Sequence, residues 1–240
     1  MGSAHEYDVM LLNNVSNGLP SEVLEKVQFV LCGFDTRGNI SEIDKKTGIE
    51  RTRKMEPKEN VWYRFEKMLT DNYRIVSPEH KAFLEKFIPN CQYPLVENEH
   101  YKRCWTKDIN HYFEHYNEVD VLLAPLEEHT FNKVKSQLKA IECAFSHTAL
   151  IASEFGPYTI DLHSIFEKGG IINNDGNAIL INENKNHKDW RKAVIKLVTN
   201  PDLVKTLQDN ISKDLCEKYD LRKITEERAE FYKKITNNKK

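Results

Sequence analysis

Short apolar runs rich in β-branched residues alternate along this chain with segments whose apolar residues recur every three or four positions. The runs predict five strands, at residues 27–33, 73–77, 120–126, 148–153 and 178–182. The periodic segments predict six helices, at residues 55–69, 78–87, 108–116, 132–146, 187–199 and 201–218. Three of the runs are almost continuously apolar, as expected of strands that are covered on both faces. The alternation predicts an α/β fold with a doubly wound, Rossmann-like parallel sheet in a three-layer αβα arrangement.

One segment departs from this alternation. Residues 39–54 form two alternating arms around Lys-Lys-Thr-Gly, which predicts an exposed β-hairpin inserted after the first strand. Its mixed charges favour a solvated insertion over a lid or a docking surface for a partner. We expect one domain over residues 1–240, with C-terminal helices over 187–235 and a frayed tail at 236–240.

The charge of the chain excludes some classes of partner. Its 240 residues carry a formal net charge of −2, from 35 Lys and Arg against 37 Asp and Glu. No chain-wide field attracts nucleic acid or anionic lipid, so we expect neither as a partner. The longest apolar runs, such as 119–126, fall far short of the roughly 18 residues that a membrane helix needs. The N-terminus shows no secretory signal, and we expect a soluble, cytoplasmic protein.

The cysteines and histidines show no spacing typical of metal ligands. The five cysteines are widely separated, with no CxxC pair, and we expect reduced thiols and no metal site. Cys32 and Cys143 lie in apolar segments, which favours small core residues over catalytic thiols. The histidines considered as ligands are too scattered to form a site: His5, His100, His111, His129 and His147.

The predicted helix at 132–146 carries the most informative pattern. On a helical wheel one stripe is apolar, made of Val134, Leu138, Ile141 and Phe145. An adjacent stripe is charged, made of Lys135, Lys139 and Glu142.

Positive charge near the start of a helix opposes the helix dipole, so Lys133 and Lys135 would be relieved by an anionic ligand. A diphosphate held by backbone N–H groups near Asn132, and by Lys135 and Ser136, is a natural candidate. Glu142, two turns on, could accept hydrogen bonds from two ribose hydroxyls. Spacing alone also fits an amphipathic helix with a solvated lysine face, in which Lys139 pairs with Glu142 or Glu127.

Sequence motifs add a resemblance. The string APLxxxxFNxxKSxLKxxE at 124–142 is followed by a short strand and by Gly-Pro-Tyr at 156–158. This stretch resembles the donor-binding domain of glycosyltransferases with the GT-B fold, of the family 4 type. Residues 30–35, the GNAIL sequence at 176–180 and the closing segment 190–219 also resemble that domain. The resemblance spans almost the whole chain; it is strong over 123–158 and in the C-terminal helices, and weak across 39–100.

The resemblance implies roles for individual residues. In the family, the second glutamate of a Glu-x7-Glu motif contacts the nucleotide ribose, and Glu142 occupies its place. The first glutamate would fall at Val134, which has no carboxylate. Its contact with the donor sugar would then come from Glu127, from Glu128 or from the side-chain amide of Asn132. Phe131 would also face the sugar. The other implied diphosphate contacts are Lys135 and Ser136, together with Gly2, Ser3 and His5 in a glycine-containing loop.

The resemblance also implies a mechanism. It is the retaining, metal-independent transfer of a sugar from a nucleotide-diphosphate donor, without a cofactor, to an acceptor glycan or other hydroxyl compound. The family holds the acceptor in an N-terminal domain, and here that domain and the strand before Gly2 would be missing. The catalytic residues would then lie outside this sequence. One alternative is a non-catalytic Rossmann-like binding or regulatory module that docks through the 39–54 hairpin. A sugar-phosphate epimerase would need carboxylates and a histidine in one cleft, and the sequence shows no such cluster.

Overall fold

The computed structural model of this chain describes residues 6–35, 38–56, 59–70, 101–167, 171–182 and 187–237. The predicted strand at 73–77, the predicted helix at 78–87 and the predicted loop residues Gly2, Ser3 and His5 lie outside these ranges. The described chain combines helices with parallel strands, which confirms the mixed α/β class. In this part of the chain every helix is too short or too polar to cross a bilayer.

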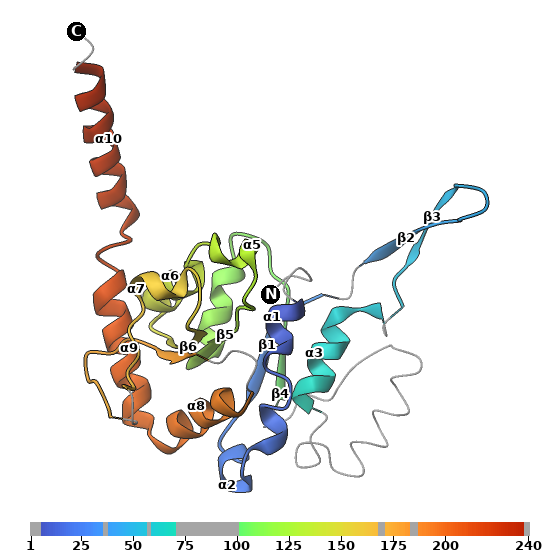
Figure 1. The fold of residues 1–240 in the computed structure, drawn as a ribbon, viewed down its shortest axis with the longest axis horizontal. Helices are drawn as coiled ribbons and strands as arrows, with labels where there is room; N and C mark the ends of the chain where they lie inside the picture. Colours follow the sequence, from blue (N-terminus) through green and yellow to red (C-terminus); the bar gives the residue numbers. More distant parts are fainter. Residues whose placement is uncertain are drawn as a thin grey trace. The chain divides into compact units, whose positions relative to one another are not determined.

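The chain divides into two compact units (Figure 1). The first comprises Met1–Val119, Pro125–Glu127 and Glu183–Asn200, and the second comprises Asp120–Ala124, Glu128–Asn182 and Pro201–Lys240. The expectation of one Rossmann-like domain with a single three-layer sheet stays a prediction, because the described strands form separate sheets within these units.

The first unit is built around two parallel strands, β1 (Phe29–Phe34) and β4 (Tyr101–Trp105), which pair from Phe29 opposite Tyr101 onward. The aromatic core beside them joins Phe34, Trp62 and Phe65, with ring centroids 5.8–6.0 Å apart. The helices that the structure describes in this unit are α1 (Glu6–Met10), η2 (Ser16–Gly18), α2 (Ser21–Leu24), α3 (Val61–Thr70), η4 (Tyr112–Glu118) and α8 (His187–Thr199).

Two helix predictions in this unit need correction. The helix predicted from residue 55 starts later: α3 begins at Val61, where the Asn60 side chain accepts a hydrogen bond from the Trp62 N–H at 2.9 Å and so caps the helix. The segment predicted as a helix at 108–116 is instead the 3₁₀ helix η4, displaced by a few residues. Asp108 lies in the turn before it and accepts bonds from the Asn110 N–H and the His111 ring, which delays the helix start.

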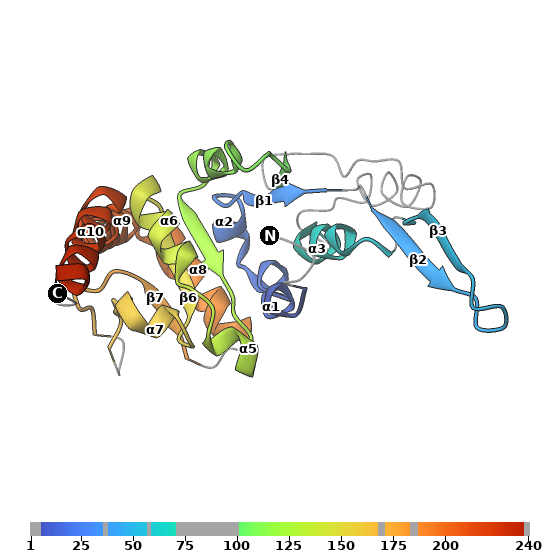
Figure 2. The ribbon, with the colours of Figure 1, turned by 90° about the horizontal axis from the view of Figure 1, so that it is seen from above.

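The predicted hairpin is confirmed. Strands β2 (Asn39–Ile43) and β3 (Glu50–Lys54) pair antiparallel as one ribbon with a tight turn, shown in Figure 2. Asp44 organises the turn by accepting from the backbone of Lys46 and Thr47. Arg53 bridges Glu42 of the opposite strand and Glu59 of the following segment, at 2.6 and 2.7 Å.

The second unit contains a parallel sheet in the order β5 (Val121–Ala124), β6 (Ala149–Ser153), β7 (Ile179–Ile181). All five residues of β6 are buried, which confirms the reading of an apolar run as a covered central strand. Helix α9 (Pro201–Leu215) packs on β6 and on α6 (Leu138–Ser146) through Leu207, Ile211 and Leu215. The remaining helices are α5 (Thr130–Lys133), α7 (Tyr158–Asp161) and α10 (Leu221–Asn237).

Candidate functional site

The segment after β5 forms the candidate site, and its helix is broken. The predicted helix at 132–146 is two helices, α5 and α6, separated by residues 134–137. Val134 ends α5 with φ −102° and ψ 6°, and Gln137 precedes α6 with ψ 33°, so neither backbone continues the helix. The prediction of one continuous helix is therefore wrong.

The break changes which residues share a face. Val134 is 80% exposed, and Leu138 and Phe145 are half exposed, so the predicted apolar stripe is also wrong. The buried face of α6 consists of Ala140, Cys143 and Ala144, with Glu142 beside them. Small residues let α6 pack closely on α9 and β6, and the break resets the helical phase that the wheel assumed continuous.

The predicted diphosphate residues lie at the break. Ser136 is exposed and Lys135 half-buried, and both lie just before Gln137, the N-cap residue of the nine-residue helix α6. The ammonium of Lys135 lies 5.5 Å from the ring centroid of Phe131, in a cation–π contact, and Phe131 is 65% exposed. The predicted conflict between Lys133 and a helix dipole is absent, because Lys133 lies in the last turn of α5, where positive charge is favourable.

Asn132 is buried on α5. Its backbone carbonyl faces the turn after β6, where a Cβ added to Gly156 would lie 3.0 Å from the carbonyl oxygen. Gly156 also has φ +58°, a left-handed conformation that favours glycine. His129 caps α5 by accepting from the Phe131 N–H at 3.2 Å. The structure thus brings the Gly-Pro-Tyr turn against the FNxxKS segment.

Glu142, the predicted ribose ligand, is 4% exposed. Lys139 Nζ donates to its Oε2 at 2.7 Å, one of the two pairings expected for this lysine. A buried carboxylate is costly without such a partner. Glu127, a predicted sugar ligand, belongs to the first unit, where its backbone N–H donates to the buried Asp8 carboxylate at 2.8 Å. Its role toward the donor stays a prediction.

A polar cluster that the sequence analysis did not single out holds the break in place. Gln137 donates to Asp161 at 3.1 Å and to the Tyr219 hydroxyl at 2.5 Å, and Lys218 and Tyr219 also donate to Asp161. Burial acts to raise the pKa of Asp161, but the hydrogen bonds from Lys218, Tyr219 and Gln137 together lower it. Gln137, Asp161 and the Lys218–Tyr219 pair lie far apart in the sequence, so no local sequence pattern predicted this cluster.

A second constellation missed by the sequence analysis lies in the first unit. Ligand atoms of Cys32, Cys104 and His115 all lie within 4.8 Å of one another. Cys32 is only half-buried and belongs to this cluster, whereas Cys143 is fully buried, as predicted for a core residue. Residues 72 positions apart could not be linked by spacing motifs, since the pairing of β1 with β4 brings them together.

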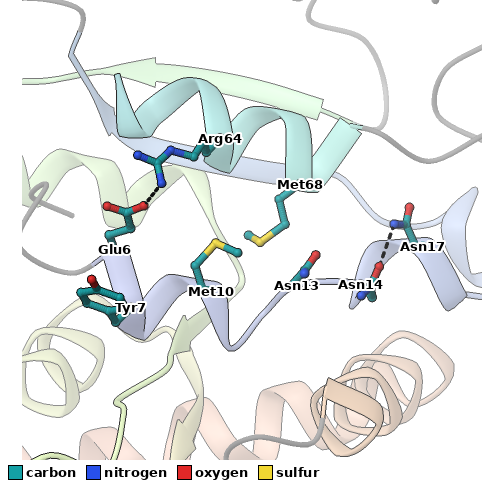
Figure 3. A pocket seen from close by; sticks show the side chains of 8 residues that line it. All are labelled: Glu6, Tyr7, Met10, Asn13, Asn14, Asn17, Arg64 and Met68. Atoms are coloured by element: carbon teal, nitrogen blue, oxygen red, sulfur yellow. Dashed lines mark hydrogen bonds and ion pairs between the residues drawn. The ribbon is translucent and has the colours of Figure 1, made fainter. Parts of the chain in front are cut away.

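An open pocket of about 370 Å³ also lies in the first unit (Figure 3). Arg64 of α3 forms an ion pair with Glu6 of α1 at one end, and Met10 and Met68 face each other across the middle. Its lining residues are Glu6, Tyr7, Met10, Asn13, Asn14, Asn17, Arg64 and Met68. Of the predicted donor-site residues that the structure describes, none lines this pocket.

No family model matches the chain, and neither a search of curated proteins nor a search of solved structures found a match. The case for a function therefore rests on the residues and geometry of this chain.

Proposed function

We propose that this chain is the donor-binding part of a glycosyltransferase of the GT-B type. In this proposal its parallel strands belong to a Rossmann-like, three-layer domain that binds a nucleotide-diphosphate sugar. Transfer to a hydroxyl acceptor is retaining and metal-independent, and the acceptor is held by a domain outside this sequence. The observation that carries the proposal is the break between α5 and α6, which places Lys135 and Ser136 just before Gln137, the N-cap residue of α6.

The break suits a diphosphate. The first N–H groups of a helix have no partner within the helix, and the dipole adds positive potential there. Lys135 supplies a full positive charge at the same point, and the Ser136 hydroxyl supplies a further donor. As the sugar leaves, negative charge grows on the diphosphate, and these groups stabilise it most when that charge is greatest.

Glu142 suits the ribose once Lys139 moves aside. The Lys139 side chain is 41% exposed and its partner only 4%, so the lysine is the mobile member of the pair. A ribose diol replaces the ammonium with two hydroxyl donors, which keeps the buried carboxylate satisfied. Lys139 lies in the first turn of α6, so its released charge adds to the positive potential at the helix start. Phe131, largely exposed beside Lys135, offers an apolar face to the sugar.

Thermal unfolding in the presence of nucleoside diphosphates tests this function. Ligand binding to the folded chain raises its stability by about 2.7 kcal/mol at a ligand concentration 100 times Kd. We expect UDP, GDP or ADP to raise the Tm of the wild-type chain and the Lys205→Ala control, in which an exposed lysine of α9 is removed. The same nucleotide should raise the Tm of Lys135→Ala much less. No rise with any nucleotide would favour a non-catalytic module.

A further inference from the structure

Two cysteine thiols lie side by side on one face of the β1–β4 sheet. Cys32 is directly opposite Cys104 in the parallel register. Because side chains alternate along a strand, both cysteines share their face with Lys102, while Arg103 points to the buried side. Both are thiols and do not form a disulfide, and Cys104 hydrogen-bonds to Cys32. The register thus fixes two soft ligands at neighbouring positions.

A histidine completes the cluster from a third element. His115 lies on η4, which packs against β1. Its two ring nitrogens are buried, and neither has a hydrogen-bond partner in the described structure. Buried polar atoms without a partner are rare and call for an explanation such as a bound ion. Burial lowers the pKa of His115, which favours the neutral ring that binds metals.

We propose that Cys32, Cys104 and His115 bind a thiophilic divalent cation of the Zn²⁺ class, with water in the fourth position. The three ligand atoms lie within 4.8 Å of one another. A tetrahedral zinc with bonds of about 2.0–2.3 Å requires ligand separations of about 3.6–3.8 Å. Closure therefore needs side-chain movements of about 1 Å. Thiolate and imidazole ligands select zinc-like ions over Ca²⁺ and Mg²⁺, which prefer oxygen.

The charges at the site balance on binding. Burial, and then the neighbouring Cys104, raise the pKa of Cys32 to about 12, so its thiol is protonated at neutral pH without metal. Each S–H bond breaks as an S–metal bond forms, and two protons leave to solvent. Two thiolates then neutralise the two positive charges of the cation, which limits the cost of placing it in a half-buried site. Glu118, which pairs with Lys102, adds negative charge near both Cys32 and His115.

Cobalt titration of the full chain tests this site, because tetrahedral Co²⁺ bound to thiolates gives a sulfur-to-cobalt charge-transfer band and strong visible bands. In the reduced, chelator-treated wild-type chain, the absorbance of these bands should rise until one equivalent of Co²⁺ has been added and then stay constant. Added Zn²⁺ should displace the Co²⁺ and abolish the bands. Cys104→Ser and His115→Gln should each weaken Zn²⁺ binding by more than about 100-fold, beyond the roughly 10–100-fold cost of losing an outer-shell partner. Cys216→Ser and His111→Ala, which change residues outside the cluster, should bind as the wild type.

Cysteine alkylation of the wild-type chain tests the site even if a variant fails to fold. Zn²⁺ should protect Cys32 and Cys104 from alkylation, as read by peptide mass spectrometry, and leave the modification of Cys216 unchanged. The proposal is overturned if the wild type gives no charge-transfer band, if Cys104→Ser gives the same band at the same Co²⁺ affinity as the wild type, or if Zn²⁺ leaves alkylation of both cysteines unchanged. It is also overturned if the two thiols oxidise to a disulfide at the same rate with and without Zn²⁺.

Discussion

Asp161 joins Gln137 to Lys218 and Tyr219, two neighbouring residues about 80 positions further along the sequence. Its carboxylate, 7% exposed, accepts from Gln137 beside the candidate site and from Lys218 and Tyr219 after α9. Hydrogen bonding to Asp161 in turn raises the pKa of Lys218. Because Gln137 directly precedes α6, this carboxylate helps to fix where the helix begins.

The lowered pKa of Asp161 predicts a pH-dependent contribution to stability. A carboxyl group whose pKa is lower in the folded state stabilises the fold above its unfolded pKa of about 3.9, and this contribution is lost as pH falls through the folded value. We expect Asp161→Asn to lower the free energy of unfolding at neutral pH by about 1–3 kcal/mol. The difference from wild type should shrink steadily in acid.

Urea unfolding followed across this pH range measures the effect. Asp175→Asn removes an exposed carboxylate from a loop of the same unit and serves as the control, with little change at any pH. A loss of stability for Asp161→Asn that stays constant down to acid pH would contradict the proposed ionic contribution.

Gly156 combines a left-handed backbone with a close neighbour. We expect Gly156→Ala to cost about 1–2 kcal/mol for the positive φ alone, and more because the Asn132 carbonyl must move. Gly48→Ala separates the two contributions, since Gly48 has φ +68° with no atom within 4 Å of an added Cβ. Chemical denaturation of both variants provides the comparison. Equal costs for the two would show that the contact with Asn132 has no effect.

At the scale of elements, continuous apolar runs predicted strands well. The strands β1, β5, β6 and β7, and the helices α8 and α9, lie within a few residues of their predicted ranges. In contrast, β4 reads Tyr-Lys-Arg-Cys-Trp and gave no apolar signal. Its Arg103 is nevertheless buried, 4.7 Å from the ring centroid of Phe34, an aromatic contact that accommodates the charge. Such pairing partners are not visible in a local pattern.

The candidate site was predictable in its residues but not in its geometry. The FNxxKSxLKxxE motif singled out Asn132, Lys135, Ser136 and Glu142, and the structure places the last three before or on α6. The break itself depends on bonds from Gln137 to residues 24 and 82 positions away, which no helical period reveals. The same holds for Cys32, Cys104 and His115, which strand pairing brings together.

Helix α9 provides the covering element of the second unit. Leu207, on the inner face of α9, is 0% exposed, whereas Leu221, at the start of α10, is 71% exposed. We expect Leu207→Ala to destabilise the fold by about 2–5 kcal/mol, because it removes buried methyl groups and leaves a cavity. The matched change Leu221→Ala should alter the unfolding free energy by less than about 0.5 kcal/mol. Thermal denaturation monitored by circular dichroism measures both, and similar losses would contradict the assigned packing.

At the scale of the whole molecule, a net charge of −2 provides no general attraction for anions. Any affinity for a nucleotide diphosphate must therefore come from a local arrangement such as Lys135, Ser136 and the start of α6. The 3₁₀ helix η4 and the β1–β4 sheet carry the proposed metal site in the other unit, so the two proposals depend on different residues. A negative result for the diphosphate site would therefore not contradict the metal site, and the reverse also holds.

Calorimetric titration with a nucleoside diphosphate and its parent nucleoside tests the central claim most directly. We expect the wild type to bind the diphosphate far more tightly than the nucleoside. Lys135→Ala should lose about 10–100-fold in diphosphate affinity, the cost of a charged hydrogen bond, with nucleoside binding unchanged. Lys205→Ala should behave as the wild type. Equal affinity for the two ligands, or an unchanged preference in Lys135→Ala, would contradict a diphosphate site at the start of α6.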